Sequence, residues 1–134
     1  MFVIAAGHPL AAKKTVTRAD LREHILLTSS NTPEPEAQWF TRAVFGRRPP
    51  HLTFQRLPLT EAILDVARAG MGIAILSEWI ASPHLGKGDL LVRRLDTGAL
   101  RRPWRFAFRA EHAQPAQRLL TVLQSAAPRL RLVG

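Results

Sequence analysis

The stretch LTEAILDVARAGMGIAILSEW, residues 59–79, decides the fold of this chain. Leu59, Ile63 and Val66 recur at the spacing of one helical face, which predicts an amphipathic helix. Thr60 is the expected N-cap of that helix, because its hydroxyl can accept a hydrogen bond from a backbone N–H group of the first turn. The stretch therefore begins with a helix that buries one side against a core.

Gly70 stands where a helix favours a left-handed residue, so the helix is expected to end there. Residues 73–76 follow without a polar break and predict a strand covered on both faces, as in a parallel sheet. Residues 51–57 alternate in polarity and predict a strand ahead of the helix. Strand, helix and strand from His51 to Leu76 form a βαβ unit with a right-handed crossover. Ligands of such sheets bind at the carboxyl ends of the strands.

Further strands and helices are predicted on both sides of the βαβ unit along the chain. We expect an α/β fold whose central sheet is largely parallel and has helices on both faces. Further strands are predicted over residues 2–6, 24–27, 90–95 and 104–108, and further helices at Thr17, after Pro33, at Ser77 and from Pro115 to 126.

A run of polar residues follows the strand at 24–27 and is the first candidate site: Thr28, Ser29, Ser30, Asn31 and Thr32. The run lies between a strand end and a helix N-terminus, where exposed N–H groups and the helix dipole suit a carboxylate. The alternative is an ordinary capping loop, because Ser, Thr and Asn are common turn residues.

Thr60, with Pro58 and Leu59 before it, is the second candidate site. It lies at the same edge of the sheet as Thr28 if the strands are parallel. The alternative is that Thr60 is only an N-cap.

Composition limits the classes of protein to consider. At 134 residues the chain forms one domain, or one domain with a fragment of another, and 46% hydrophobic residues suffice for a packed core. The net charge of +9 comes from arginines scattered along the sequence, which favours a solvated basic surface over a nucleic-acid groove. No membrane-spanning run and no signal peptide are present, and there is no cysteine, so we expect a cytoplasmic protein.

Residues that carry chemistry do not form a recognisable catalytic pattern. The five histidines, His8, His24, His51, His84 and His112, lack metal-ligand spacing, and none stands near a serine and an acid. There is no phosphate-binding loop, dinucleotide fingerprint or pair of catalytic carboxylates. The tryptophans, Trp39, Trp79 and Trp104, favour core or hinge packing. We therefore expect no enzyme, no cofactor and no metal.

Several blocks of the sequence resemble a known family, and their order and spacing along the chain match that family as well. Residues 62–76, which run into Ala-Gly-Met-Gly-Ile-Ala-Ile-Leu, resemble the signature of the effector-binding domain of LysR-type transcriptional regulators. His8-Pro9-Leu10-Ala11, followed by Thr17 to Leu21, resembles the crossover segment of the same family. Met71 to Ala74 and Trp79 are most similar to the branch that regulates methionine biosynthesis.

The resemblance implies a fold like that of type 2 periplasmic binding proteins, with two subdomains joined by crossover strands. Residues 1–9 would be the outgoing crossover, 10–100 the second subdomain, and 101–134 the return crossover and a helix of the first subdomain. The rest of the first subdomain and the N-terminal helix-turn-helix would be absent.

The resemblance also implies a function. The loop Thr28–Thr32 would line the effector cleft, and Leu59–Thr60 would contact the effector, a small anionic metabolite such as homocysteine. The full-length protein would form dimers or tetramers, would bind DNA only through its helix-turn-helix and would not contact a membrane. Two alternatives stay open: a solute-binding protein fragment of the same fold, and a small basic nucleic-acid-binding protein.

Overall fold

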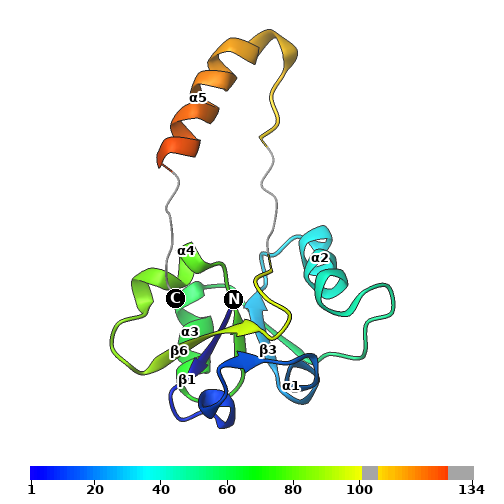
Figure 1. Cartoon of the computed structure of the whole chain (residues 1–134), viewed down its shortest axis with the longest axis vertical. Coiled ribbons are helices and arrows are strands. Elements are labelled where there is room, and N and C mark those ends of the chain that lie inside the picture. The colour runs from blue at the N-terminus through cyan, green and yellow to red at the C-terminus, as the bar shows by residue number, and fades with distance from the viewer. Residues whose placement is uncertain (101–105, 127–134) are drawn as a thin grey trace. The chain divides into compact units, whose positions relative to one another are not determined.

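The computed structural model describes residues 1–100 and 106–126 of the chain. These residues fall into two compact units, one of residues 1–100 and one that contains residues 106–126. The first unit holds a six-stranded sheet with the order β2-β6-β1-β5-β3-β4 (Figure 1). Its strands are β1 (Phe2–Ala5), β2 (Thr15–Val16), β3 (Leu26–Ser29), β4 (Phe54–Leu57), β5 (Ile73–Ile75) and β6 (Leu90–Leu95).

Helices connect these strands in the first unit and make up the regular structure of the second. The first unit contains α1 (Arg18–Glu23), α2 (Glu34–Phe45), α3 (Thr60–Arg68) and α4 (Glu78–Ala81), with short 3₁₀ helices η1 (Pro9–Ala12) and η2 (Ser82–His84). The second unit contains η3 (Ala110–His112) and α5 (Ala113–Ala126). In the described ranges, no helix is long and apolar enough to cross a membrane.

The sheet is largely parallel, as predicted. β3 lies between β4 and β5 and runs parallel to both, and β2 runs parallel to β6. Only β1 is antiparallel to its neighbours, β5 and β6. Because β3, β4 and β5 share one direction, the loops that follow them meet at one side of the sheet, which we call the carboxyl edge; the opposite side is the amino edge.

Helices cover both faces of the sheet, which confirms the predicted layers. One face packs on Leu21 of α1 and on Phe40 and Val44 of α2. The other face packs on α3, through Ile63, Leu64 and Ala67, and on Ala81 of α4. All four residues of β1 are buried. Their unbroken apolar run follows from contact with both layers.

Helix α3 ends as the sequence predicts. Gly70 has φ +74°, a left-handed conformation. The N–H of Gly70 donates to the carbonyl of Ala67 at 2.9 Å, and the N–H of Met71 donates to that of Val66 at 3.2 Å. These two bonds form the Schellman arrangement, which satisfies carbonyls at the helix end.

The start of α3 differs from the prediction. Leu59 is the N-cap: its backbone is extended, and its carbonyl accepts a hydrogen bond from Ile63 at 3.1 Å. Thr60 is the first helical residue and makes no capping bond, so its assignment as N-cap was wrong. Leu59 is also 62% exposed, because the buried face of α3 is centred one position further along, on Ile63, Leu64 and Ala67.

Several strand predictions also differ from the structure, and the strand predicted over residues 51–57 begins only at Phe54. The strand predicted over residues 24–27 begins at Leu26 and runs to Ser29, because His24 caps the end of α1. The strand predicted over residues 104–108 is absent from Phe106–Phe108, which are irregular and exposed, while residues 104 and 105 lie outside the described ranges. The short strand β2 was not predicted. Its two residues are too few to show alternation.

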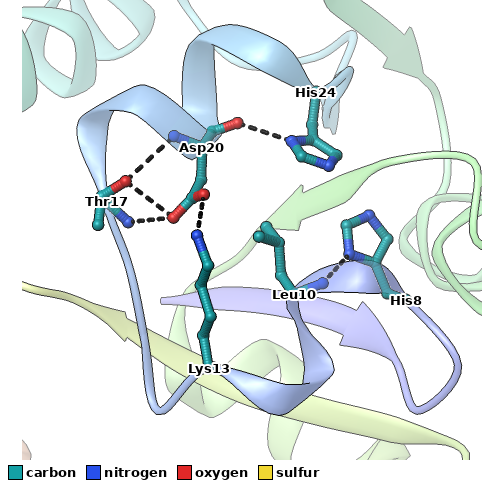
Figure 2. Close-up of polar contacts among 6 residues, drawn as sticks. All are labelled: His8, Leu10, Lys13, Thr17, Asp20 and His24. Atoms are coloured by element: carbon teal, nitrogen blue, oxygen red, sulfur yellow. Dashed lines mark hydrogen bonds and ion pairs between the residues drawn. The ribbon is translucent and has the colours of Figure 1, made fainter.

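A polar network holds the start of α1 (Figure 2). The carboxylate of Asp20 accepts from the N–H and the hydroxyl of Thr17, both at 2.8 Å, and from Lys13 Nζ at 2.6 Å. The Thr17 hydroxyl in turn accepts from the N–H of Asp20 at 3.2 Å, which completes a capping box. Burial by itself would raise the pKa of Asp20, but the bonds from Lys13 and Thr17 outweigh it and hold that pKa below its usual range.

Candidate functional site

The loops that follow β3 and β4 lie side by side at the carboxyl edge. β3 and β4 are in register from Leu26 and Phe54 to Ser29 and Leu57. Beyond them, the N–H of Ser30 donates to the Leu57 carbonyl at 2.9 Å. The side-chain amide of Asn31 donates to the Pro58 carbonyl at 3.3 Å. The two candidate sites of the sequence, 28–32 and 59–60, are therefore at the same edge of the sheet, as expected.

The polar run forms a tight turn of its own. The Ser29 hydroxyl accepts from the N–H of Asn31 at 3.1 Å, and the Ser29 carbonyl accepts from the N–H of Thr32 at 3.3 Å. Ser30 and Asn31 are exposed, while Ser29 and Thr32 are half-buried. These two hydrogen bonds within the turn hold its backbone conformation, and the turn exposes polar atoms to solvent.

Thr28 and Ser29 point to opposite faces of the sheet, because side chains alternate along a strand. Leu26, on the same side as Thr28, packs with α1 and α2, while Leu27, on the side of Ser29, packs with α3. The Thr28 and Ser29 hydroxyls therefore do not lie on the same face of the sheet. Ser29 shares the α3 side of the sheet, whereas Thr28 shares the α2 side.

The helix N-termini at the carboxyl edge carry no side-chain caps. Leu59 before α3, Pro33 before α2 and Ser77 before α4 make no capping hydrogen bond. The first backbone N–H groups of α3 are therefore not engaged by a side-chain acceptor, and the helix dipole makes this end positive. Such an end suits a carboxylate, and Thr60 adds a hydroxyl to it.

Arg56 of β4 lies beside the polar run and is not among the residues predicted from the sequence. It pairs in register with Thr28 of the adjacent strand β3, so the two side chains share one face. Its side chain is exposed and has no hydrogen bond or ion pair in the described part of the chain. The alternation of residues 51–57 already placed Arg56 on one face of its strand. Only the strand pairing shows that this face adjoins Thr28.

Other features of the described residues lie away from this site. A pocket lined by Ala19, Arg22, Glu23 and His51 lies at the amino edge, where α1 ends and β4 begins. Across residues 1–100 and 106–126, no group of three or more His, Asp or Glu side chains could hold a metal ion. The carboxyl edge therefore offers hydroxyls, an amide, N–H groups and one cation, which together suit a small anion.

Comparison with known proteins identifies the family to which the fold belongs. The family model of the LysR substrate binding domain matches residues 1–128. No curated protein matches the chain.

Solved structures of the same family are similar in fold. The regulatory domain of MetR, a LysR family regulator from N. meningitidis, is 27% identical with a TM-score of 0.64 over 73% of this chain and 45% of that one. A variant of that domain with two cysteines replaced by serine is 23% identical, with a TM-score of 0.73 over 99% of this chain and 66% of that one. The Synechocystis PCC6803 CcmR regulatory domain, in complex with 2-PG, is 17% identical with a TM-score of 0.63 over 96% of this chain and 62% of that one. This chain thus spans less than two thirds of the length of each.

Proposed function

We propose that this chain, which belongs to the LysR substrate-binding domain family, binds a small anionic metabolite at the carboxyl edge of its sheet and so regulates transcription. One observation carries the proposal: the turn at Ser29–Asn31 is bonded to the loop that leads into the uncapped N-terminus of α3. Hydroxyls, an amide and backbone N–H groups that no side chain caps thereby lie together at the carboxyl edge. A carboxylate is the ligand group that such donors stabilise best.

Arg56 extends the site to the other face of β4 and supplies a full positive charge beside Thr28. A metabolite with two charged groups could place its carboxylate at the α3 N-terminus and a second anionic group at Arg56. A guanidinium binds a carboxylate or phosphate through two parallel hydrogen bonds, which adds geometric selectivity to the charge.

The domain organisation of the whole regulator is also part of the proposal. Residues 1–9 would be a crossover strand, 10–100 the second subdomain, and 101–134 the return crossover and a helix of the first subdomain. The two compact units, which divide near residue 100, support this assignment. The regulator would self-associate and would contact operator DNA through a separate helix-turn-helix. Metabolite binding would act by favouring one arrangement of the subdomains over another, since only differential affinity can shift such an equilibrium.

Homocysteine is the first effector to test, because the resemblance of Met71 to Ala74 and of Trp79 to the branch that regulates methionine biosynthesis implies it. The 27% identity to the MetR regulatory domain supports this choice of branch. A second probe is 2-PG, which is bound to the CcmR regulatory domain.

The test is calorimetric titration of the full-length regulator with each probe. Ser29→Ala and Thr60→Ala should each weaken binding about tenfold to a hundredfold, since a hydrogen bond to a charged group contributes about 1.5–3 kcal/mol. Thr53→Ala removes a hydroxyl from the amino edge of β4 and is the matched control, with unchanged affinity. If Ser29→Ala and Thr60→Ala both keep the wild-type affinity for a probe that binds, the site is elsewhere.

A separate prediction concerns Arg56. Arg56→Ala should weaken a doubly charged probe about tenfold or more and a singly charged one much less, because only the former has a group for the guanidinium. The Arg56→Lys variant keeps the charge and should retain part of the affinity. Arg22→Ala, which removes an exposed arginine at the amino edge, is the control. Equal losses for singly and doubly charged probes would contradict a role in selectivity.

A further inference from the structure

Two histidines that lie 16 positions apart in the sequence meet at the amino edge of the sheet. His8, in the turn that follows β1, is 4% exposed, and His24 caps the end of α1. Their ring centroids lie 5.0 Å apart, with the ring planes tilted by 46°. This contact joins η1, which starts after His8, to helix α1.

The hydrogen bonds of the two rings define their protonation. Nδ1 of His8 accepts from the N–H of Leu10 at 3.1 Å, so this nitrogen carries no proton and the ring is neutral with its proton on Nε2 (Figure 2). Nδ1 of His24 lies 2.9 Å from the Asp20 carbonyl, an acceptor, so this nitrogen carries a proton. His8 therefore serves as the N-cap of η1 only in its neutral form.

We propose that the His8–His24 pair is an acid-sensitive contact, which holds η1 on α1 while His8 is neutral and opens when His8 takes up a proton. A proton on Nδ1 would face the N–H of Leu10, so the cap of η1 would be lost. A proton that added to the ring would also place a buried positive charge 5.0 Å from the ring of His24. Both effects act against the closed arrangement.

The charged groups around His8 leave a proton on it uncompensated. On α1, the Asp20 carboxylate is taken by Lys13 and Thr17, and Glu23 is exposed. Next to the end of β1, the Oδ2 atom of Asp89 accepts from Arg68 Nε at 2.6 Å, and its Oδ1 atom is buried without a hydrogen-bond partner among the described residues. Residues of β1 itself are apolar. In the described ranges, no carboxylate is bonded to His8.

The direction of the titration follows from this environment. Burial, and then the neighbouring His24, lower the pKa of His8 below its ordinary value of 6.5. A histidine whose pKa is lower in the folded state binds fewer protons there than in the unfolded chain. Its contribution to stability is therefore present above pH 6.5 and is lost as the pH falls from there through the folded pKa.

The contact is linked to the sheet, because the N–H of His8 donates to the Ala5 carbonyl of β1 at 3.1 Å. Acid would thus loosen the chain where it leaves β1 for η1. This place is at the opposite edge from Ser29–Asn31, so the contact is independent of the proposed effector site.

The test is a nuclear magnetic resonance titration of the wild-type chain from pH 8 to pH 5, with the ring nitrogens and the Leu10 amide observed together. We expect His8 to titrate below 6.5 from the Nε2–H form, and the Leu10 amide to lose protection from hydrogen exchange over the same range. A His8 that titrates like a free imidazole, or a Leu10 amide that stays protected after His8 is protonated, would overturn the proposal.

A substitution of His8 distinguishes the effect of its protonation from the effect of its role as the N-cap of η1. His8→Asn keeps a side-chain oxygen that can accept from Leu10 but cannot titrate, so the acid-dependent loss of Leu10 protection should disappear. His112→Asn removes an exposed histidine of the second unit and should leave the loss unchanged. The opposite pattern, with the loss retained in His8→Asn, would assign the acid sensitivity to another group. The wild-type titration tests the proposal even if His8→Asn fails to fold.

Discussion

Gly72→Val is expected to lower the free energy of unfolding by about 3 kcal/mol or more, or to prevent folding. A Cβ atom at Gly72 would lie 2.6 Å from the carbonyl oxygen of Ile25 and 3.1 Å from Cγ of Leu27. That carbonyl accepts the N–H of Ile73 at 2.8 Å and so begins the pairing of β5 with β3. The Ile25 carbonyl is part of the backbone and cannot move aside as the end of a flexible side chain could. The clash would therefore separate the central strands β3 and β5.

Thermal and denaturant unfolding measure this effect, and two other glycines provide controls. Gly7→Ala adds a Cβ with no heavy atom within 4 Å and should change the stability little. Gly70→Ala also enters open space, but at φ +74° it should cost about 1 kcal/mol through backbone strain. A Gly72→Val protein that melts at the wild-type temperature would show that β5 can shift away from Ile25.

Asp20→Ala is expected to lower the free energy of unfolding by about 2–4 kcal/mol. The side chain is 6% exposed, and its loss removes the acceptor for the N–H and hydroxyl of Thr17 and for Lys13. The capping box of α1 would then be broken, and a half-buried N–H would lack a partner. The ion pair of Lys13 with Asp20 contributes less to stability than its 2.6 Å distance suggests, because Lys13 is 50% exposed and water screens its charge.

Asp20 also predicts a loss of stability in acid. For Asp20 the folded state favours the charged form, whereas for His8 it favours the neutral form. The pKa of Asp20 is lowered in the folded state, so the folded chain binds its proton less readily than the unfolded chain. The stabilisation is therefore present above the usual pKa of the carboxyl, about 3.9, and is lost as the pH falls through the folded value.

Unfolding curves at several pH values check the effect of Asp20. The wild-type protein should lose more stability than Asp20→Ala between pH 5 and the folded pKa. Asp96→Ala, which removes an exposed carboxylate that accepts from the N–H of Thr97, is the matched control and should resemble the wild type. If Asp20→Ala and the wild type lose stability in parallel, the Asp20 carboxylate is not the group that titrates.

The position of the candidate residues at one edge of the sheet could be predicted from the sequence, whereas their role in binding stays a prediction. The run 28–32 and Thr60 were found because polar residues after a buried strand, or at a helix start, stand out from their neighbours. Their place at one edge followed from the parallel sheet, and the bonds of Ser30 to Leu57 and Asn31 to Pro58 agree with it. Arg56 was missed because an arginine in an alternating strand has no local mark of function among many scattered arginines.

The sequence by itself determined the order of the elements, the layers and the turn at Gly70, because these depend on periodicity and on the conformations open to neighbouring residues. Tertiary structure alone decided which residues face each other. The antiparallel direction of β1, the pairing of Arg56 with Thr28 and the contact of His8 with His24 join positions far apart in the chain. No local pattern encodes such pairs, because strand order and helix packing depend on burying all the apolar faces at once.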